Sequence, residues 1–161
     1  MQRRKKNGYF KPVQEAPKPL SIQVKKRVQF SEVDALGIVW HGRYPVYFEE
    51  ASAALGRFCG LSYKDYFEAN IGAPIVQFHV DYHQSLRLED EFVVKASLIW
   101  CEGAKLNTEF MIMKKDGMVT TTGYSVQMFI RSSTNEFCLY PPELLERCRC
   151  RWLSGELKCL Q

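Results

Sequence analysis

The sequence predicts an α+β fold in which a five-stranded antiparallel sheet wraps around one long central helix, followed by a short C-terminal helix. Three observations support this prediction. One segment, beginning near Pro45, carries apolar residues at helical spacing. Five segments alternate apolar and polar residues, which is the pattern of strands with one buried face. The order is one strand, the helix and then four strands, which argues against a doubly wound parallel sheet.

The first strand and the central helix are predicted from the spacing of apolar residues. Val24, Val28 and Phe30 alternate with charged and amide side chains, which predicts a strand. Pro45 suits the first turn of a helix, because its missing N–H would have no partner there. Gly60 suits the C-terminal end of the same helix. The buried stripe of this helix is expected to comprise Phe48, Ala51, Leu55 and Phe58.

Four further strands and a terminal helix follow. The alternating segments cover residues 75–83, 92–100, 106–114 and 118–130, and residues 61–70 are expected to form a short turn or helix. Lys115-Asp116-Gly117 predicts a hairpin turn between the last two strands. Pro141 and Pro142 mark the start of the terminal helix. The outward face of the sheet is mixed in character, and a second copy of the chain is expected to cover it.

The composition argues against several classes of function. The 161 residues suit one globular domain, and no apolar run approaches the ~20 residues that span a bilayer, so membrane insertion is not expected. Residues 1–20 contain six Lys or Arg and one Glu, a charge of +5, so the other residues sum to −1 of the total +4. We therefore expect a flexible basic arm and no nucleic-acid-binding face. Six cysteines without a secretory leader favour reduced thiols in a cytoplasmic protein.

The segment 30–50 between the first strand and the helix carries the chemistry-bearing residues. Asp34 lies in a turn and His41 precedes the helix start. A carboxylate beside a helix N-terminus places a nucleophile or base next to amide donors that stabilise developing negative charge. An Asp at such a place also serves as an ordinary cap or turn residue, so spacing alone leaves both interpretations open.

The same segment resembles the signature of hotdog-fold acyl-CoA thioesterases of the 4-hydroxybenzoyl-CoA thioesterase and YbgC-like family. The resemblance lies in an aromatic residue at Phe30, then Asp34, a glycine at Gly37, two aliphatic residues, an aromatic residue and His41. It extends more loosely over about residues 22–147. The chain then divides into a basic arm (1–20), a hotdog domain (21–147) and a C-terminal tail (148–161).

The resemblance implies a thioester hydrolase. Asp34 falls where the family has its nucleophile or general base, and the main-chain N–H of His41 falls where the family polarises the thioester carbonyl. It implies no cofactor and no metal, because coenzyme A is part of the acyl-CoA substrate. Dimers with the site at their interface are expected, and a homotetramer. The residues expected to contact substrate are Gly37, Val39, Trp40, Tyr44 and Glu49.

Several alternatives stay open at this point. Asp34 either attacks the acyl carbon to give a mixed anhydride or activates water directly. A hotdog-fold hydratase or dehydratase, or a non-catalytic acyl-CoA-binding module, would share the fold. The sequence does not indicate which acyl group is preferred or how a tetramer would be arranged. Nothing in the sequence singles out the contacts of the CoA phosphates among the candidates Arg87, Lys105 and Arg131.

Overall fold

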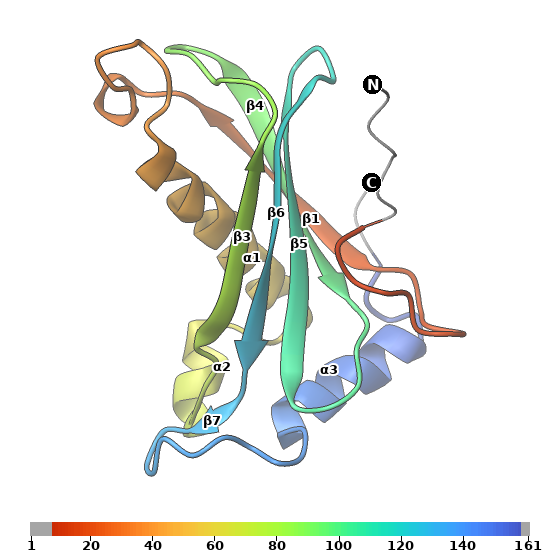
Figure 1. Cartoon of the computed structure of the whole chain (residues 1–161). Coiled ribbons are helices and arrows are strands. Elements are labelled where there is room, and N and C mark those ends of the chain that lie inside the picture. The colour runs from red at the N-terminus through yellow and green to blue at the C-terminus, as the bar shows by residue number, and fades with distance from the viewer. Residues whose placement is uncertain (1–7, 159–161) are drawn as a thin grey trace.

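The computed structural model describes residues 8–158 and confirms the predicted α+β architecture (Figure 1). A five-stranded antiparallel sheet has the strand order β1-β4-β5-β6-β3. Its curved face packs on the long helix α1, and β1 and β3 form its two free edges. The strands are β1 (Leu20–Arg27), β3 (Ile75–Tyr82), β4 (Glu91–Ile99), β5 (Lys105–Lys114) and β6 (Val119–Met128).

The helix α1 (Tyr44–Cys59) buries one apolar stripe against the sheet. Phe48 stacks on Phe110 of β5 with ring centroids 4.5 Å apart. The approach is close because position 123 of β6 is a glycine: a Cβ there would lie 2.7 Å from the Phe48 ring. Gly60 ends the helix in the left-handed conformation with φ +74°, as the sequence predicts. The fully buried residues of the stripe are Tyr44, Tyr47, Phe48, Ala51, Leu55 and Cys59.

Smaller elements complete the chain. Short 3-10 helices, η1 (Phe30–Glu32) and η2 (His41–Arg43), flank the loop ahead of α1. The helix α2 (Tyr63–Glu68) falls in the segment expected to form a short helix, and the terminal helix is α3 (Glu143–Leu153). The sequence missed a small two-stranded pairing of β2 (Ile71–Gly72) with β7 (Ile130–Arg131). No helix within residues 8–158 has the length and apolarity needed to cross a membrane.

Two predicted strand ends are wrong. The first strand stops at Arg27: the Val28 N–H still bonds to the Asp90 carbonyl, and the chain then turns into η1 at Phe30. Phe30, predicted on the buried face of that strand, is 82% exposed. The last predicted strand is broken at Phe129, which leaves the sheet and is fully buried, so that β6 ends at Met128 and β7 begins at Ile130. A 3-10 turn overrides the alternating pattern at Phe30, and at Phe129 the pattern is interrupted by one buried residue between two strands.

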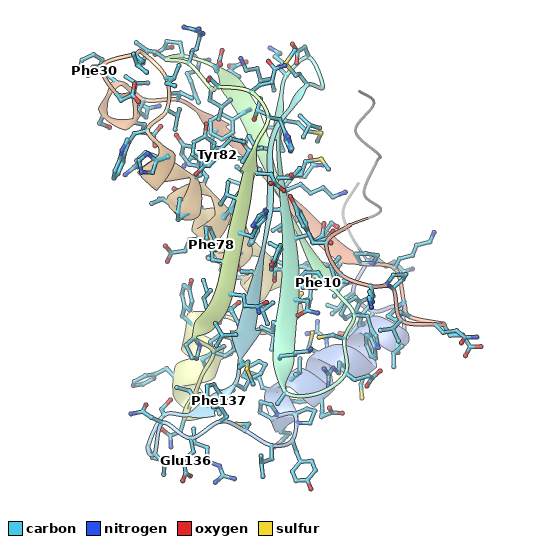
Figure 2. The ribbon with its side chains drawn as sticks, in the orientation of Figure 1. Phe10, Phe30, Phe78, Tyr82, Glu136 and Phe137 are labelled. Atoms are coloured by element: carbon cyan, nitrogen blue, oxygen red, sulfur yellow. The ribbon has the colours of Figure 1, made fainter. Side chains whose placement is uncertain are left out.

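The described part of the N-terminal arm lies against the outer face of the sheet. The Tyr9 hydroxyl donates to Asp81 Oδ2 at 2.6 Å and lies 2.7 Å from Thr122 Oγ1. The Phe10 ring packs edge-on against Tyr124, on the side of the sheet away from α1 (Figure 2). At the other end of the arm, the Trp152 indole of α3 donates to the Lys18 carbonyl at 2.8 Å. Residues 1–7 of the arm and 159–161 of the tail lie outside the described residues.

Candidate active site

The loop between β1 and α1 closes on itself as a narrow turn that presents Asp34. Val33 and Val39 form an antiparallel bridge at its base. The Asp34 N–H donates to the Ile38 carbonyl at 2.9 Å, and the Gly37 N–H donates to the Asp34 carbonyl at 3.0 Å. Gly37 has a φ of +70°, in the left-handed region that glycine adopts without strain. The backbone of Asp34 is therefore fixed on both sides.

The Asp34 side chain has one structural contact and one unoccupied oxygen. Its Oδ1 accepts the Leu36 N–H at 2.8 Å, which is an Asx turn. Within residues 8–158 its Oδ2 accepts no hydrogen bond, and the side chain is partly exposed. The carboxylate thus fulfils the turn role that spacing alone suggested and keeps an oxygen for chemistry.

Helical backbone begins at His41, earlier than the predicted start near Pro45. The short helix η2 leads straight into α1, and the Arg43 N–H donates to the Trp40 carbonyl at 2.9 Å. The N–H of His41 belongs to the first turn and has no acceptor within residues 8–158. Because the peptide dipoles of the helix add up toward this end, the His41 amide is suited to a partner with negative charge.

The His41 side chain has different surroundings from the His41 amide. The imidazole is exposed and lies beside the Trp40 ring, with centroids 5.0 Å apart. Within residues 8–158 no hydrogen bond joins it to Asp34. The His41 carbonyl lies 3.5 Å from the Tyr82 hydroxyl of β3. The backbone, not the imidazole, is the polar group that His41 contributes beside the Asp34 turn.

The structure places the remaining predicted substrate contacts in three different surroundings. Gly37 and Trp40 lie at the surface beside the turn, and Trp40 is 49% exposed. Val39 and Tyr44 are buried in the core of the protomer. Glu49 is exposed on α1, 3.5 Å from the Tyr63 hydroxyl, and its eight-residue separation from His41 corresponds to roughly 12 Å along a helix.

An apolar surface runs from the helix start along the free edge of the sheet. Tyr82 and Phe78 point to the α1 side of β3, and both are exposed (Figure 2). The Tyr82 ring packs edge-on against Tyr44, and the Phe78 ring contacts Phe48. Tyr82 lies nearest the helix start, where its hydroxyl is 3.5 Å from the His41 carbonyl, and Phe78 lies further along β3.

The candidate phosphate contacts do not lie together. Arg87 is exposed and its backbone bridges Ile38 in the Asp34 turn. Lys105 opens β5 and Arg131 lies in β7, at the opposite end of the sheet from that turn (Figure 1). Among the three, only Arg87 adjoins the candidate site within one protomer.

Sequence reasoning missed a buried acid two residues before Asp34. Glu32 is only 5% exposed; its Oε2 accepts the Gln29 N–H at 2.8 Å and its Oε1 accepts Arg43 Nη2 at 3.1 Å. The spacing Gln29-x-x-Glu32 is that of a capping box, which is a readable signal for an acid that turns back onto the backbone. The sequence offers no signal for the pairing with Arg43, which depends on how the turn closes.

Hydrogen-bond donors and the positive charge of Arg43 favour the ionised form of Glu32. Burial alone would raise the pKa of Glu32. The Gln29 N–H, the nearby Tyr47 hydroxyl and the Arg43 guanidinium outweigh burial and hold that pKa below its ordinary value. The Tyr47 hydroxyl is itself buried without a well-formed hydrogen bond in residues 8–158, and burial followed by the negative charge of Glu32 raises the pKa of Tyr47.

The sheet wrapped around one long helix is the hotdog fold, and an acidic turn precedes the helix N-terminus. The pattern that describes the Thioesterase-like superfamily matches residues 28–148, and the chain belongs to this superfamily. The match includes the Asp34 turn and all of α1. It also includes Glu32 and Arg43.

Relatives of known sequence carry related names. A Bacillus subtilis protein named "Putative acyl-CoA thioesterase YneP" is 25% identical over 117 residues, which cover 70% of this chain and 75% of that protein. A Synechocystis protein named "Putative esterase sll0410" is 28% identical over 92 residues, or 57% of this chain. The chain spans about half of the length of that second relative (55%).

Solved structures share the fold. A DHNA-CoA thioesterase from Staphylococcus aureus is 23% identical with a TM-score of 0.73, over 87% of this chain and 97% of that chain. A second Staphylococcus aureus protein, solved in complex with CoA, is 17% identical with a TM-score of 0.74, over 90% of each chain. At these identities the likeness establishes the architecture.

Proposed function

We propose that the protein is an acyl-CoA thioesterase, which hydrolyses an acyl-CoA thioester to a carboxylic acid and coenzyme A. The observation that carries this proposal is the pairing of two groups at one loop. Asp34 keeps a carboxylate oxygen without a hydrogen-bond donor in residues 8–158, and His41 keeps an amide without an acceptor there. Membership of the Thioesterase-like superfamily supports the same reaction class.

The chemistry needs no more than these two groups. The His41 N–H donates to the thioester oxygen, at the positive end of η2 and α1, and stabilises the negative charge that develops on that oxygen. The Asp34 carboxylate attacks the acyl carbon, CoA leaves as thiolate, and water then cleaves the mixed anhydride. Alternatively, Asp34 takes a proton from the water that attacks the acyl carbon. Both routes give the acid and the CoA thiol.

We propose further that the working form is an oligomer built on the β3 edge. β3 is a free edge with exposed backbone groups and exposed apolar side chains at Phe78 and Tyr82. Such an edge pairs readily with another strand, and a second copy of β3 would extend the sheet across both protomers. This pairing would place partner residues beside the Asp34 turn and close the open side of the site. Two such dimers would form the homotetramer.

The substitution Asp34→Asn tests the proposal. The side-chain amide oxygen of the variant still accepts the Leu36 N–H, so the Asx turn is preserved and only the charge is removed. We expect the wild type to release thiol from at least one ester in a panel of short, long and aromatic acyl-CoA esters. The rate of thiol release should fall by at least ~100-fold in the variant. Thermal unfolding of both proteins serves as the control for folding.

Three results would contradict the proposal. Asp34→Asn with wild-type turnover would remove Asp34 from the reaction. Hydration of an enoyl-CoA without thiol release would indicate a hydratase. Binding of acyl-CoA esters with neither reaction would indicate a non-catalytic acyl-CoA-binding module.

A further inference from the structure

A partly buried ion pair crosses the base of the turn that carries Asp34: Glu32 is buried, and 36% of the Arg43 side chain is exposed. Glu32 lies two residues before Asp34, and Arg43 lies two residues after His41. Arg43 Nη2 reaches Glu32 Oε1 at 3.1 Å, so this contact is a direct side-chain link between the two ends of the segment. The Trp40 N–H adds a second link, because it donates to the Glu32 carbonyl at 2.9 Å.

The two partners are anchored in different elements. Glu32 is the last residue of η1, and its second carboxylate oxygen is held by the Gln29 N–H at 2.8 Å. Arg43 is the last residue of η2 and leads into α1. Tyr47 lies one helical turn further on and is fully buried near the same carboxylate. The pair therefore joins the end of η1, two residues before Asp34, to the end of η2, the short helix that begins with His41.

Such a pair fixes geometry more than it adds stability. Burying the Glu32 carboxylate costs much of what its attraction to Arg43 returns, and the partly exposed Arg43 guanidinium is screened by water, so the pair gives little net stabilisation. An ion pair with directed hydrogen bonds still holds one register, whereas apolar side chains of similar size would tolerate sliding. A displacement of ~1 Å between a nucleophile and the group that polarises its target is enough to cost ~100-fold in rate.

We infer that Glu32 and Arg43 are positioning residues that hold Asp34 at a fixed distance from the His41 amide. The inference rests on the proposed function, because it assigns the pair a role only if Asp34 and His41 act together. Neither side chain touches the reacting atoms. Both act through the turn between them.

The substitution Glu32→Gln is the first test. The Gln29 N–H and the Arg43 guanidinium bond to different oxygens of Glu32, and a glutamine of the same shape replaces one of these with an NH2 donor, so one of the two contacts is lost. We expect kcat for acyl-CoA hydrolysis to fall by at least ~10-fold while KM changes less than ~3-fold, because the pair orders the transition-state geometry and does not bind substrate.

A double-mutant cycle identifies the pair as the cause. Arg43→Met is expected to lower kcat to a similar extent, and the double variant is expected to be no slower than the slower single variant. Arg43→Lys keeps the charge without the guanidinium fork, so it should recover part of the kcat that Arg43→Met loses. It also serves as the milder variant if Glu32→Gln or Arg43→Met yields little folded protein.

Arg149 provides a matched control for general destabilisation. It is buried more deeply than Arg43, with 10% of its side chain exposed against 36%, and it pairs with Glu146 on α3 and with the carbonyls of Cys101 and Gly103. These contacts lie at the α3 end of the sheet, away from the Asp34 turn (Figure 1). Arg149→Met is expected to lower the melting temperature as Arg43→Met does and to leave kcat unchanged.

The outcomes separate the two proposals. If Asp34→Asn is inactive but Glu32→Gln and Arg43→Met both turn over at the wild-type rate, the inference is wrong and the proposed function stands. If Asp34→Asn retains wild-type turnover, the proposed function is wrong and the inference falls with it. If Arg149→Met loses as much kcat as Arg43→Met at an equal loss of melting temperature, the effect is general and the positioning role is refuted.

Discussion

The substitution Gly123→Ala is expected to destabilise the protein by forcing β3 away from β6 and the Phe48 ring of α1 away from the sheet. Gly123 lies in β6 beneath the helix, at the point where the sheet is closest to Phe48. A Cβ at this position would lie 2.3 Å from the His79 carbonyl oxygen and 2.7 Å from the Phe48 ring. Because ordinary contact begins at 3.4 Å, the His79 carbonyl must retreat by roughly 1 Å. The carbonyl belongs to the backbone, so a rotamer change cannot relieve the clash.

The cost of this overpacking is about 1–3 kcal/mol of unfolding free energy. For a chain of this size each kcal/mol corresponds to about 2–4 °C, so the melting temperature should fall by about 2–12 °C. Urea unfolding is the second assay: the midpoint should fall while the slope stays unchanged, because the surface exposed on unfolding is the same. β3 is an edge strand, so it can move outward and the variant should still fold.

Gly72→Ala is the matched control. Gly72 also lies in a strand, but the nearest atom to an added Cβ is Ile130 Cγ1 at 3.2 Å, which is part of a flexible side chain. The control should therefore lose less than ~1 kcal/mol. A Gly123→Ala protein that melts with the wild type, or no earlier than the control, would refute the argument that the glycine sets the spacing of α1 and the sheet.

Two further predictions concern the arm and the end of α1. Burial, followed by the hydrogen bond to Asp81, raises the pKa of Tyr9 to about 12; because the protonated phenol is the stabilised form, its contribution is complete below the unfolded pKa of ~10 and is lost as the pH rises toward 12. The hydrogen bond from Tyr9 also helps to lower the pKa of Asp81, so this contact is lost again as the pH falls through the folded pKa of Asp81. The difference in phenolate absorbance between the wild type and Tyr9→Phe measures the titration of Tyr9. Protease cleavage of the arm as a function of pH measures the loss of the contact at both the high-pH and the low-pH end. A Tyr9 that titrates near 10 would contradict the docking of the arm. Gly60→Ala places a Cβ at φ +74° and should cost about 1 kcal/mol in urea unfolding, whereas an unchanged midpoint would show that the helix ends differently.

The fold could be predicted from the sequence because the patterns that indicate helices, strands and turns each extend over only a few residues. Each of these patterns depends on residues close by in the chain. They are the helical stripe that includes Phe48 and Leu55, the alternation in β4 and β5, and the end of α1 at Gly60. These local patterns agree with one another, and such agreement specifies one architecture. The wrong strand ends near Phe30 and Phe129 have the opposite cause: the chain leaves the strand there, into η1 at Phe30 and at the buried residue Phe129 between β6 and β7, although the alternation continues.

Some residues of the candidate site could likewise be predicted from the sequence, and others could not. Asp34 and His41 could be found from the sequence, because a turn residue and a helix start lie close together along the chain. The closure of the turn by Glu32 and Arg43 could not, since their contact spans eleven residues and exists only when β1 and α1 are packed. Tyr9 and Asp81, 72 residues apart, meet for the same reason.

By itself, then, the sequence determined the class of fold, the loop that carries Asp34 and the family resemblance of that loop. Only the tertiary structure decided which oxygen of Asp34 is unoccupied, which groups fix the turn, and that Val39 and Tyr44 face the core and not a surface site. The physical reason is that periodicity and turn chemistry are properties of short segments. Side-chain pairing and burial are set by the packing of elements that are distant in the chain.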